Sequence, residues 1–427
     1  MISGGRPTRA AAGAPVPAPG PCPLARTEGK SPMASTPLPL TLANLLLRPT
    51  LGSRHDPDRV FDRIVAGAGG ADGDEEFTEN FRFLLREWAK DEDLGPVGWQ
   101  SAQAHVRRHL TNRARIRRLI AENPAIGQEP VEKPVFVVGL PRTASTLTHG
   151  VLSVSDDHRC PLLWELLAPD LEPSPRERQK RITTARRVLN GSHLLSPRFR
   201  DIHPMTAEGP EECTFLLPHA LVPLAQARIP AYHAWHFEHD FTPDYRHLRQ
   251  ALQVLQYGRP RRRWILKSPF HTGNLDALVK VFPDATLVWT HRDPAAAVAS
   301  FCSLVEVGMV TSLRRFDPRE LGATWLDLLG RSVRRGLAAR TGIAPDALVD
   351  VPYSSLGADP AAGAPKLYEA VGARWTEADA ARLPGAAAHA RGGRPHRYDL
   401  ARYGLTPADV ESAFADYNAL RAEVDRV

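Results

Sequence analysis

Cysteine is scarce in this chain, which carries four in 427 residues: Cys22, Cys160, Cys213 and Cys302. They lie far apart and form no CxxC pair. Neither a disulfide framework nor a cysteine-based zinc site is therefore expected, and free thiols are typical of a reducing compartment. On this ground the sequence predicts a cytoplasmic protein.

Long apolar runs are also lacking. No stretch of about 18 apolar residues stands out, so no membrane span is expected. The first 34 residues have no apolar core of the length that a secretory signal needs. They are rich in Pro, Gly and Ala, a composition that predicts a disordered tail over residues 1–36, and Met33 offers an alternative start of translation.

No single block of one charge dominates the sequence. The formal net charge is +6, and the excess comes from arginines spread along the chain. Such a moderate excess suits an anionic ligand and does not by itself indicate nucleic-acid binding. With no zinc-finger spacing and no RNA-binding aromatic signature, we expect a small-molecule partner and no nucleic acid; the oligomeric state stays open.

Residues 37–125 are predicted to form a helical region ahead of the first strand. After a short apolar stretch at 38–47, apolar residues recur at helical spacing over 58–65, 77–88 and 99–120. The last of these helices also carries many arginines. A solvated arginine face opposite an apolar face is the favoured interpretation, with a nucleic-acid or membrane surface as the alternative.

The chain is organised around residues 133–152, KPVFVVGLPRTASTLTHGVL. Val135 to Val138 predict a buried strand, followed by a small-residue loop and the start of a helix. The first N–H groups of a helix lack backbone partners, and the helix dipole favours an anion there. Arg142 adds a cation, and Ser145 and Thr146 add hydroxyl groups, so the loop is a candidate phosphate site. An ordinary turn with a capped helix is the competing interpretation.

This loop is not a Walker A loop, because it lacks the lysine that precedes Ser or Thr in that motif. A nucleotide kinase or NTPase on the same architecture is therefore the weaker alternative.

A strand–helix–strand–helix pattern follows at residues 263–304, where RWILK and ATLVWT predict strands around a helix at 275–282. This unit predicts a parallel sheet, in which ligands bind beyond the carboxyl ends of the strands. Arg142, Lys267 and Arg292 all follow strand ends. Three cations converging on one rim indicate a polyanionic ligand. A last strand is expected near 348–356 and a final helix over 406–424.

GLPRTASTL and ILKSPF…FPDATLVWTHRDPAAAVAS, in this order, resemble the PAPS-dependent sulfotransferases of bacterial type, which are related to the tyrosyl-protein sulfotransferases. PAPS is the adenosine phosphate-phosphosulfate that donates sulfuryl groups. The first motif is similar to the family's P-R-S-G-T-T loop but has Ala144 where glycine is usual. The resemblance implies an α/β fold with a P-loop-like parallel β-sheet flanked by helices, with an N-terminal helical extension and helical insertions. It places the sulfotransferase domain at 130–405 and a C-terminal helix packed on it at 406–427.

The resemblance also implies PAPS as cofactor, PAP as product, and sulfuryl transfer to a hydroxyl or amine of a small-molecule acceptor, with no metal. It assigns the phosphosulfate to the loop residues Arg142, Thr143, Ala144, Ser145 and Thr146, and the ribose phosphate to Arg292 and Ser300. Arg394 and Arg397 lie in a basic loop resembling the family's GKHRY segment. They either close over the cofactor phosphate or belong to a solvated linker. We expect residues 160–257 to line the acceptor pocket.

Lys267 matches the strand-end lysine of the family, which stabilises the leaving oxygen. The general base stays open. Glu165 lies where related enzymes have a base glutamate, and His271 is the alternative. His203 and Glu212, in a segment resembling HP…EPEEC, are further candidates, although packing or helix capping is favoured for that segment. A non-catalytic nucleotide-binding relative is a further alternative because of Ala144.

Overall fold

The computed structural model describes residues 36–70, 74–391 and 399–426, so the predicted N-terminal tail lies almost wholly outside the described residues. Its sheet has five parallel strands in the order β2-β3-β1-β4-β5. They are β1 (Val135–Gly139), β2 (His158–Arg159), β3 (Arg263–Lys267), β4 (Thr286–His291) and β5 (Leu348–Pro352). The parallel α/β sheet predicted from the sequence is confirmed, and only the two-residue edge strand β2 was not expected.

The side chains of β1 alternate between two buried layers. Val135 and Val137 pack on α5 (Ser145–Leu152), α15 (Pro360–Ala370) and α16 (Glu377–Arg391). Phe136 and Val138 pack on the opposite layer, which includes α10 (Thr242–Gln256) and α11 (Leu275–Val281). Because both faces are covered, β1 is a continuous apolar run, as is usual in parallel sheets.

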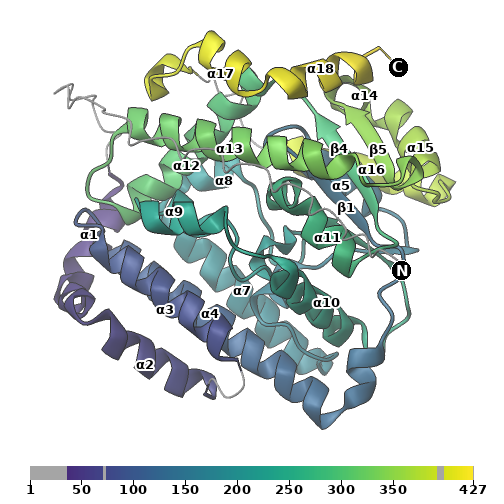
Figure 1. Cartoon of the computed structure of the whole chain (residues 1–427). Coiled ribbons are helices and arrows are strands. Elements are labelled where there is room, and N and C mark those ends of the chain that lie inside the picture. Colours follow the sequence, from purple (N-terminus) through teal and green to yellow (C-terminus); the bar gives the residue numbers. More distant parts are fainter. Residues whose placement is uncertain (1–35, 71–73, 392–398, 427) are drawn as a thin grey trace, which may run out of the picture. The chain divides into compact units, whose positions relative to one another are not determined.

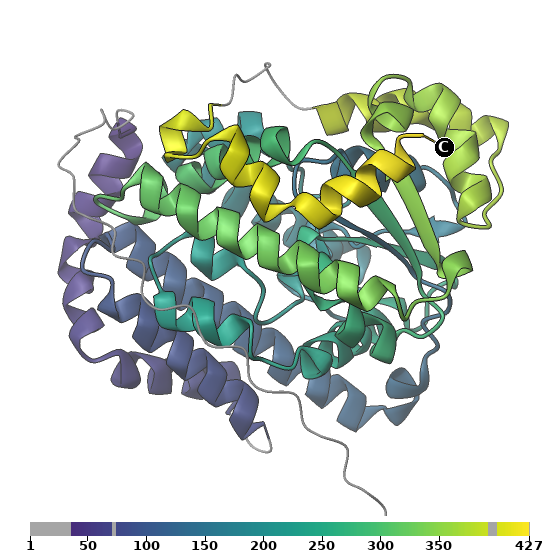
Figure 2. The same cartoon turned by 45° about the horizontal axis from the view of Figure 1, so that its top comes forward.

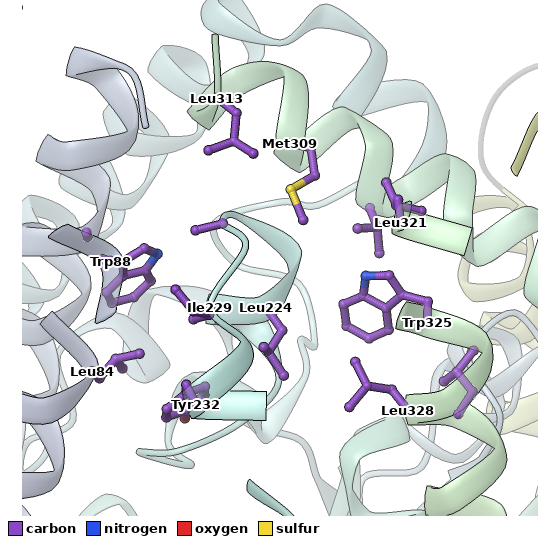
Figure 3. Packing of buried hydrophobic residues seen from close by; sticks show 14 of the residues in the cluster. Leu84, Trp88, Leu224, Ile229, Tyr232, Met309, Leu313, Leu321, Trp325 and Leu328 are labelled. Atoms are coloured by element: carbon purple, nitrogen blue, oxygen red, sulfur yellow. The ribbon is translucent and has the colours of Figure 1, made fainter. Parts of the chain in front are cut away.

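The predicted N-terminal helices are confirmed as α1 (Leu38–Leu47), α2 (Pro57–Ala68), α3 (Glu75–Lys90) and α4 (Pro96–Glu122). Figure 1 shows α2, α3 and α4 beside one another, on the side of the helical core away from the strands. They share a core with α12 (Pro294–Ser312) and α13 (Pro318–Arg340). In Figure 3, Trp88 of α3 and Trp325 of α13 flank the segment that carries Leu224, Ile229 and Tyr232.

Helix α12 is, among the described helices, the one that is long and apolar enough to cross a membrane by length and composition alone. Within its apolar window 61% is buried, and Val298, Cys302 and Val305 belong to the core shared with α3 and α4. A core helix meets the same criteria of length and composition as a membrane span. The packing of α12 is that of a core helix.

The expected single C-terminal helix is two helices, α17 (Pro407–Ala413) and α18 (Ala415–Val424), which lie along α13 in Figure 2. Thr406 caps α17 as predicted, in a capping box with Asp409. The chain bends at Phe414, whose φ of −120° is not helical. The bend lets Phe414 and Tyr417 both enter the core, and sequence periodicity alone does not reveal it.

The remaining described helices connect these layers: α6 (Leu163–Leu167), α7 (Pro175–Leu195), α8 (Pro197–Ile202), α9 (Pro230–His236) and α14 (Tyr353–Gly357). Short 3-10 turns include Cys213–Phe215 and Pro269–Asn274. The first three helices and the Cys213 turn fall in the long connection between β2 and β3. That connection supplies much of the site described next.

Candidate active site

The carboxyl ends of four strands bring candidate ligand side chains to one rim. Arg142 follows β1, Lys267 ends β3, Arg292 follows β4, and Tyr353 follows β5. Gly139 lets β1 approach β4 here, because its φ is +126° and a Cβ would lie 2.5 Å from the Thr290 carbonyl oxygen. The convergence of Arg142, Lys267 and Arg292 predicted from the sequence is present in the structure.

The loop after β1 has an unusual backbone. Arg142 (φ 69°) and Ala144 (φ 68°) are both left-handed, a region that costs an L-residue about 1–2 kcal/mol. The hydroxyl of Thr143 points into the fold, where it donates to the Leu140 carbonyl (2.7 Å) and lies 2.6 Å from the Thr290 hydroxyl. Of the predicted loop ligands, Thr143 therefore offers only its backbone.

Arg142, Ser300 and Arg292 lie together although they are far apart in the sequence. The Nε of Arg142 donates to the Ser300 Oγ over 3.0 Å, and the Nη1 of Arg292 donates to the Arg142 carbonyl over 2.9 Å. The guanidinium of Arg292 stacks 4.3 Å from the centre of the Tyr353 ring. Within the described part of the chain these arginines contact a hydroxyl, backbone carbonyls and a ring, and no carboxylate pairs with either, so both charges are available to an anion. Tyr353 was not among the site residues predicted from the sequence, although its position directly after a strand could have indicated it.

The N-terminus of α5 faces the same rim. Ala144 occupies the cap position and has no side-chain acceptor, so the first N–H groups of the helix have no side-chain cap. Ser145 and Thr146, the first two helical residues, both line the cavity. Unpaired N–H groups beside two hydroxyls form a surface suited to phosphate or sulfate oxygens.

Lys267 is buried and connects the loop to a carboxylate. Its Nζ donates to the Glu212 Oε1 over 2.6 Å and lies 3.5 Å from the Thr146 hydroxyl. Glu212 lies just before the Cys213 turn and lines the cavity. The structure therefore places a carboxylate, and not only a cation, next to the phosphosulfate-type loop.

Glu165 does not lie in this arrangement. Its Oε1 accepts from Arg159 (3.0 Å) and Arg259 (2.7 Å), and its Oε2 accepts from the Leu162 amide (3.1 Å). The side chain is buried and the cavity wall does not include it. The sequence-based placement of Glu165 at the acceptor is corrected here: with three donors on its carboxylate, Glu165 fixes α6 to the segment before β3.

His271 is also enclosed in the core. Its Nε2 lies 3.0 Å from the Cys213 Sγ, its Nδ1 lies 2.8 Å from the Tyr245 hydroxyl, and its ring packs edge-on against Phe136. Burial lowers the pKa of His271 to about 3. The structure does not bring this alternative base to the cavity, because Ser268, Pro269 and Phe270 lie between β3 and the histidine and line the wall themselves.

His203 and Glu211 stand next to Glu212 in the cavity wall. The Nε2 of His203 lies 3.4 Å from the Glu211 Oε1. Burial favours the neutral form of Glu211, but His203 and Lys267 outweigh it and hold the pKa of this carboxyl below its usual range. These three side chains are close enough to share a metal ion, but Glu211 and Glu212 are already engaged by His203 and Lys267.

A second group with metal-ligand spacing is His219, His239 and Asp244. Asp244 accepts from His219 (2.9 Å) through one oxygen and from His239 (3.1 Å) through the other. These histidines do not line the cavity, and neither do His233 and His236. Asp244 and the aromatic rings of Trp235 and Phe241 hold the imidazoles of His219 and His239.

The cavity next to the rim has a volume of about 720 Å³, a size suited to a small organic ligand. Much of its wall is apolar and comes from residues 163–226, within the range expected to line it; examples are Leu163, Met205 and Phe215. A second wall, from α4, was not predicted. The predicted phosphate ligands Arg394 and Arg397 lie outside the described residues.

A model of the sulfotransferase family matches residues 134–377, from the start of β1 to the start of α16. The chain belongs to the sulfotransferase family. The match covers more than half of the chain and includes the loop of Arg142, the buried Lys267 and the Arg292–Ser300 pair. The family resemblance carried by the two sequence motifs is thereby confirmed.

Similar proteins come from mycobacteria. The chain is 27% identical over 257 residues to the omega-hydroxy-beta-dihydromenaquinone-9 sulfotransferase Stf3 of Mycobacterium bovis, across 56% of this chain and 63% of that protein. The match thus spans less than two thirds of that relative. The crystal structures of sulfotransferases STF1 from Mycobacterium tuberculosis (28% identity) and STF9 from Mycobacterium avium (27%) both superpose with a TM-score of 0.73. Each superposition covers 84% of this chain, and they cover 98% of STF1 and 95% of STF9.

Proposed function

We propose that this sulfotransferase moves a sulfuryl group from PAPS to a hydroxyl or amine of a largely apolar small molecule. One observation carries the proposal: the Lys267 Nζ stands between the Thr146 hydroxyl of the anion loop and the Glu212 carboxylate of the cavity wall. A cation at the donor site and a carboxylate at the acceptor site are the two groups that such a transfer needs.

The donor set fits PAPS. The N-terminus of α5, with Ser145 and Thr146, suits the phosphosulfate, and Arg142, Ser300 and Arg292 supply two unpaired cations and a hydroxyl for phosphate oxygens. When bound, PAPS supplies the activated sulfuryl group. Tyr353 would hold the Arg292 guanidinium in place through the ring contact.

In this mechanism Glu212 is the general base. Its Oε1 accepts the proton that an acceptor hydroxyl loses as the new O–S bond forms. Lys267 donates to the oxygen on which negative charge gathers as the old S–O bond breaks, a role prepared by its position beside Thr146. The Lys267–Glu212 ion pair holds the carboxylate at the cavity wall, next to the anion loop.

The acceptor class follows from the cavity wall. Apolar side chains of α7, α12 and the segment before α9 surround the space next to Glu212, and they suit the hydrocarbon body of an alcohol. The relative Stf3 is named for an isoprenoid quinone alcohol, an acceptor of this kind. A cytoplasmic location is part of the proposal, since the three described cysteines are free and buried.

The test is isothermal titration of the whole chain with PAP and with ATP, at moderate salt and without magnesium. We expect micromolar PAP binding, weak ATP binding, and loss of PAP binding in Arg292→Ala. Equal or tighter ATP binding would overturn the proposal in favour of a nucleotide kinase. PAP binding without sulfuryl transfer from PAPS to any of a panel of apolar alcohols and amines would indicate a non-catalytic relative.

A further inference from the structure

The wall that α4 gives to the cavity is chemically distinct from the rest. Ser101, Ala104, His105 and Arg108 line the cavity at positions i, i+3, i+4 and i+7, so one face of α4 is turned toward it. The other three side chains on this face are small or uncharged. Arg108 is the exception, because it brings a permanent charge to an otherwise apolar wall.

Arg108 has no carboxylate partner among the described residues. Its Nη2 lies 3.5 Å from the His105 Nδ1 and 3.4 Å from the His109 Nε2, and its Nε is buried without a hydrogen bond. Its guanidinium lies 5.5 Å from the centre of the Phe215 ring, another wall residue. The two long contacts with imidazoles and the contact with one ring face supply no negative charge to balance the guanidinium.

The groups around Arg108 make it energetically costly to keep the guanidinium charged in this position. Burial lowers the pKa of Arg108 to about 10, and burial with the Arg108 charge holds the pKa of His105 well below its usual range. The imidazoles of His105 and His109 are therefore neutral at pH 7, and neither supplies the negative charge that would balance the guanidinium. Three other half-buried arginines of the helical region have carboxylate partners: Arg82 with Asp62, Arg113 with Asp74 and Arg115 with Asp170. A half-buried arginine in a cavity wall with no carboxylate partner among the described residues points to an anionic partner within the cavity.

Three arginines that have no carboxylate partner within the described ranges line the cavity: Arg142, Arg292 and Arg108. The proposed function assigns the first two to the phosphates of PAPS. Arg108 comes from a different wall and a different part of the chain, and it stands with Phe215 at the apolar side. No group of the transfer reaction accounts for it.

Resting on the proposed function, we propose that Arg108 binds an anionic oxygen group of the acceptor, a carboxylate or a phosphate ester, carried on the apolar body away from the hydroxyl that is sulfated. The acceptor is then an amphiphile with two polar ends. The planar fork of arginine suits either anion, and the apolar side chains of the cavity wall suit the chain between the two ends.

The first experiment measures binding of octanoate, octyl phosphate and 1-octanol to the whole chain with PAP kept saturating, so that Arg142 and Arg292 are occupied. We expect one or both anions to bind at least tenfold more tightly than 1-octanol, and the comparison of octanoate with octyl phosphate identifies which anion is preferred. Arg108→Met should abolish the preference, and Arg108→Lys should keep part of it. Arg107→Met, at the exposed neighbouring position, is the matched control and should change nothing.

Equal binding of the three probes by the unaltered protein overturns the proposal, as does a preference that survives in Arg108→Met. If Arg108→Met does not fold, the unaltered protein and Arg108→Lys still decide the matter. PAP titration of each variant separates this inference from the proposed function: if PAP itself does not bind, the anion preference is measured without it. An anion preference lost in Arg292→Ala but kept in Arg108→Met would also overturn the proposal.

The second experiment uses turnover with two matched acceptors, 12-hydroxydodecanoate and 1,12-dodecanediol. The hydroxy acid should have a KM about tenfold lower than the diol, with a similar kcat. In Arg108→Met the two KM values should become equal while kcat for the diol is kept. A fall in kcat for both acceptors without a change in their KM ratio would instead show a purely structural role.

Discussion

The Nζ of Lys267 lies 2.6 Å from the Oε1 of Glu212, across 55 residues of sequence, and both side chains stand at the junction of the anion loop and the cavity. This ion pair is the reason for proposing Glu212 as the base. Glu165 and His271 are bound to other partners in the core, whereas Glu212 pairs with Lys267 and lines the cavity.

Glu212→Gln should lower kcat by about 10²–10⁴-fold, because the amide cannot accept the acceptor proton. The dissociation constant for PAP should change less than threefold, since Glu212 does not bind the phosphates. Steady-state kinetics with PAPS and a titration with PAP measure the two effects. A near-normal kcat in this variant would indicate that Glu212 is not the base and that His203, another titratable side chain in the cavity wall, takes that role.

Glu165→Gln should instead reduce stability. Removing the charge leaves Arg159 and Arg259 without their shared carboxylate, and breaking a buried pair costs about 3–5 kcal/mol. Urea unfolding measures this loss, and Glu122→Gln, whose ion pair with Arg118 is exposed, is the control with little change. If the folded Glu165→Gln protein were stable but inactive, Glu165 would be the base after all.

Ala144→Gly should raise the free energy of unfolding by about 1 kcal/mol, because glycine adopts the left-handed backbone of this position without the Cβ penalty. The same substitution at Ala338, an exposed position inside α13, should lower stability by about 1 kcal/mol. Thermal or urea unfolding of both variants gives the comparison. Equal effects of the two substitutions would contradict the strained loop.

Arg142→Ala should weaken PAP binding by about 100-fold, a loss typical of a charge-assisted hydrogen bond to phosphate. Ser300→Ala should have a smaller effect of about tenfold, because the hydroxyl is uncharged and also holds Arg142 in place. Arg118→Ala, on the exposed face of α4, should leave the titration unchanged. Equal loss of binding in Arg142→Ala and Arg118→Ala would indicate nonspecific charge attraction, which higher salt would abolish.

The protein should lose stability as the pH falls from about 6.5 toward 4. Burial lowers the pKa of His149 to about 4 and those of His236, His247 and His271 to about 3, so all four stay neutral in the folded chain while they become protonated in the unfolded chain. The unfolded state then binds more protons, and each histidine lowers the free energy of unfolding by about 1.4 kcal/mol per pH unit. Urea unfolding at several pH values measures the slope. In His271→Gln the free energy of unfolding should fall less steeply with decreasing pH, by the contribution of one histidine. An unchanged pH dependence would contradict this account.

The sequence alone determined the parallel sheet, the anion loop and the three rim cations. Each of these depends on local pattern: an apolar run predicts a buried strand, and the residues that follow such strands lie at one edge of the sheet. Arg142, Lys267 and Arg292 could therefore be chosen without knowing any contact. The same local pattern predicted the helices of the N-terminal region.

Only the tertiary structure decided which polar groups face the cavity. Glu165, Glu212 and His271 all have side chains that can accept a proton, and which of them faces the cavity depends on partners up to 94 residues away, such as Arg259 for Glu165. Arg108 looked like one of many arginines on a solvated helix face, and only the packing of α4 against the cavity shows that it has no counter-ion in the part of the chain that the structure describes. Sequence periodicity gives the face of a helix, but it does not give what that face meets.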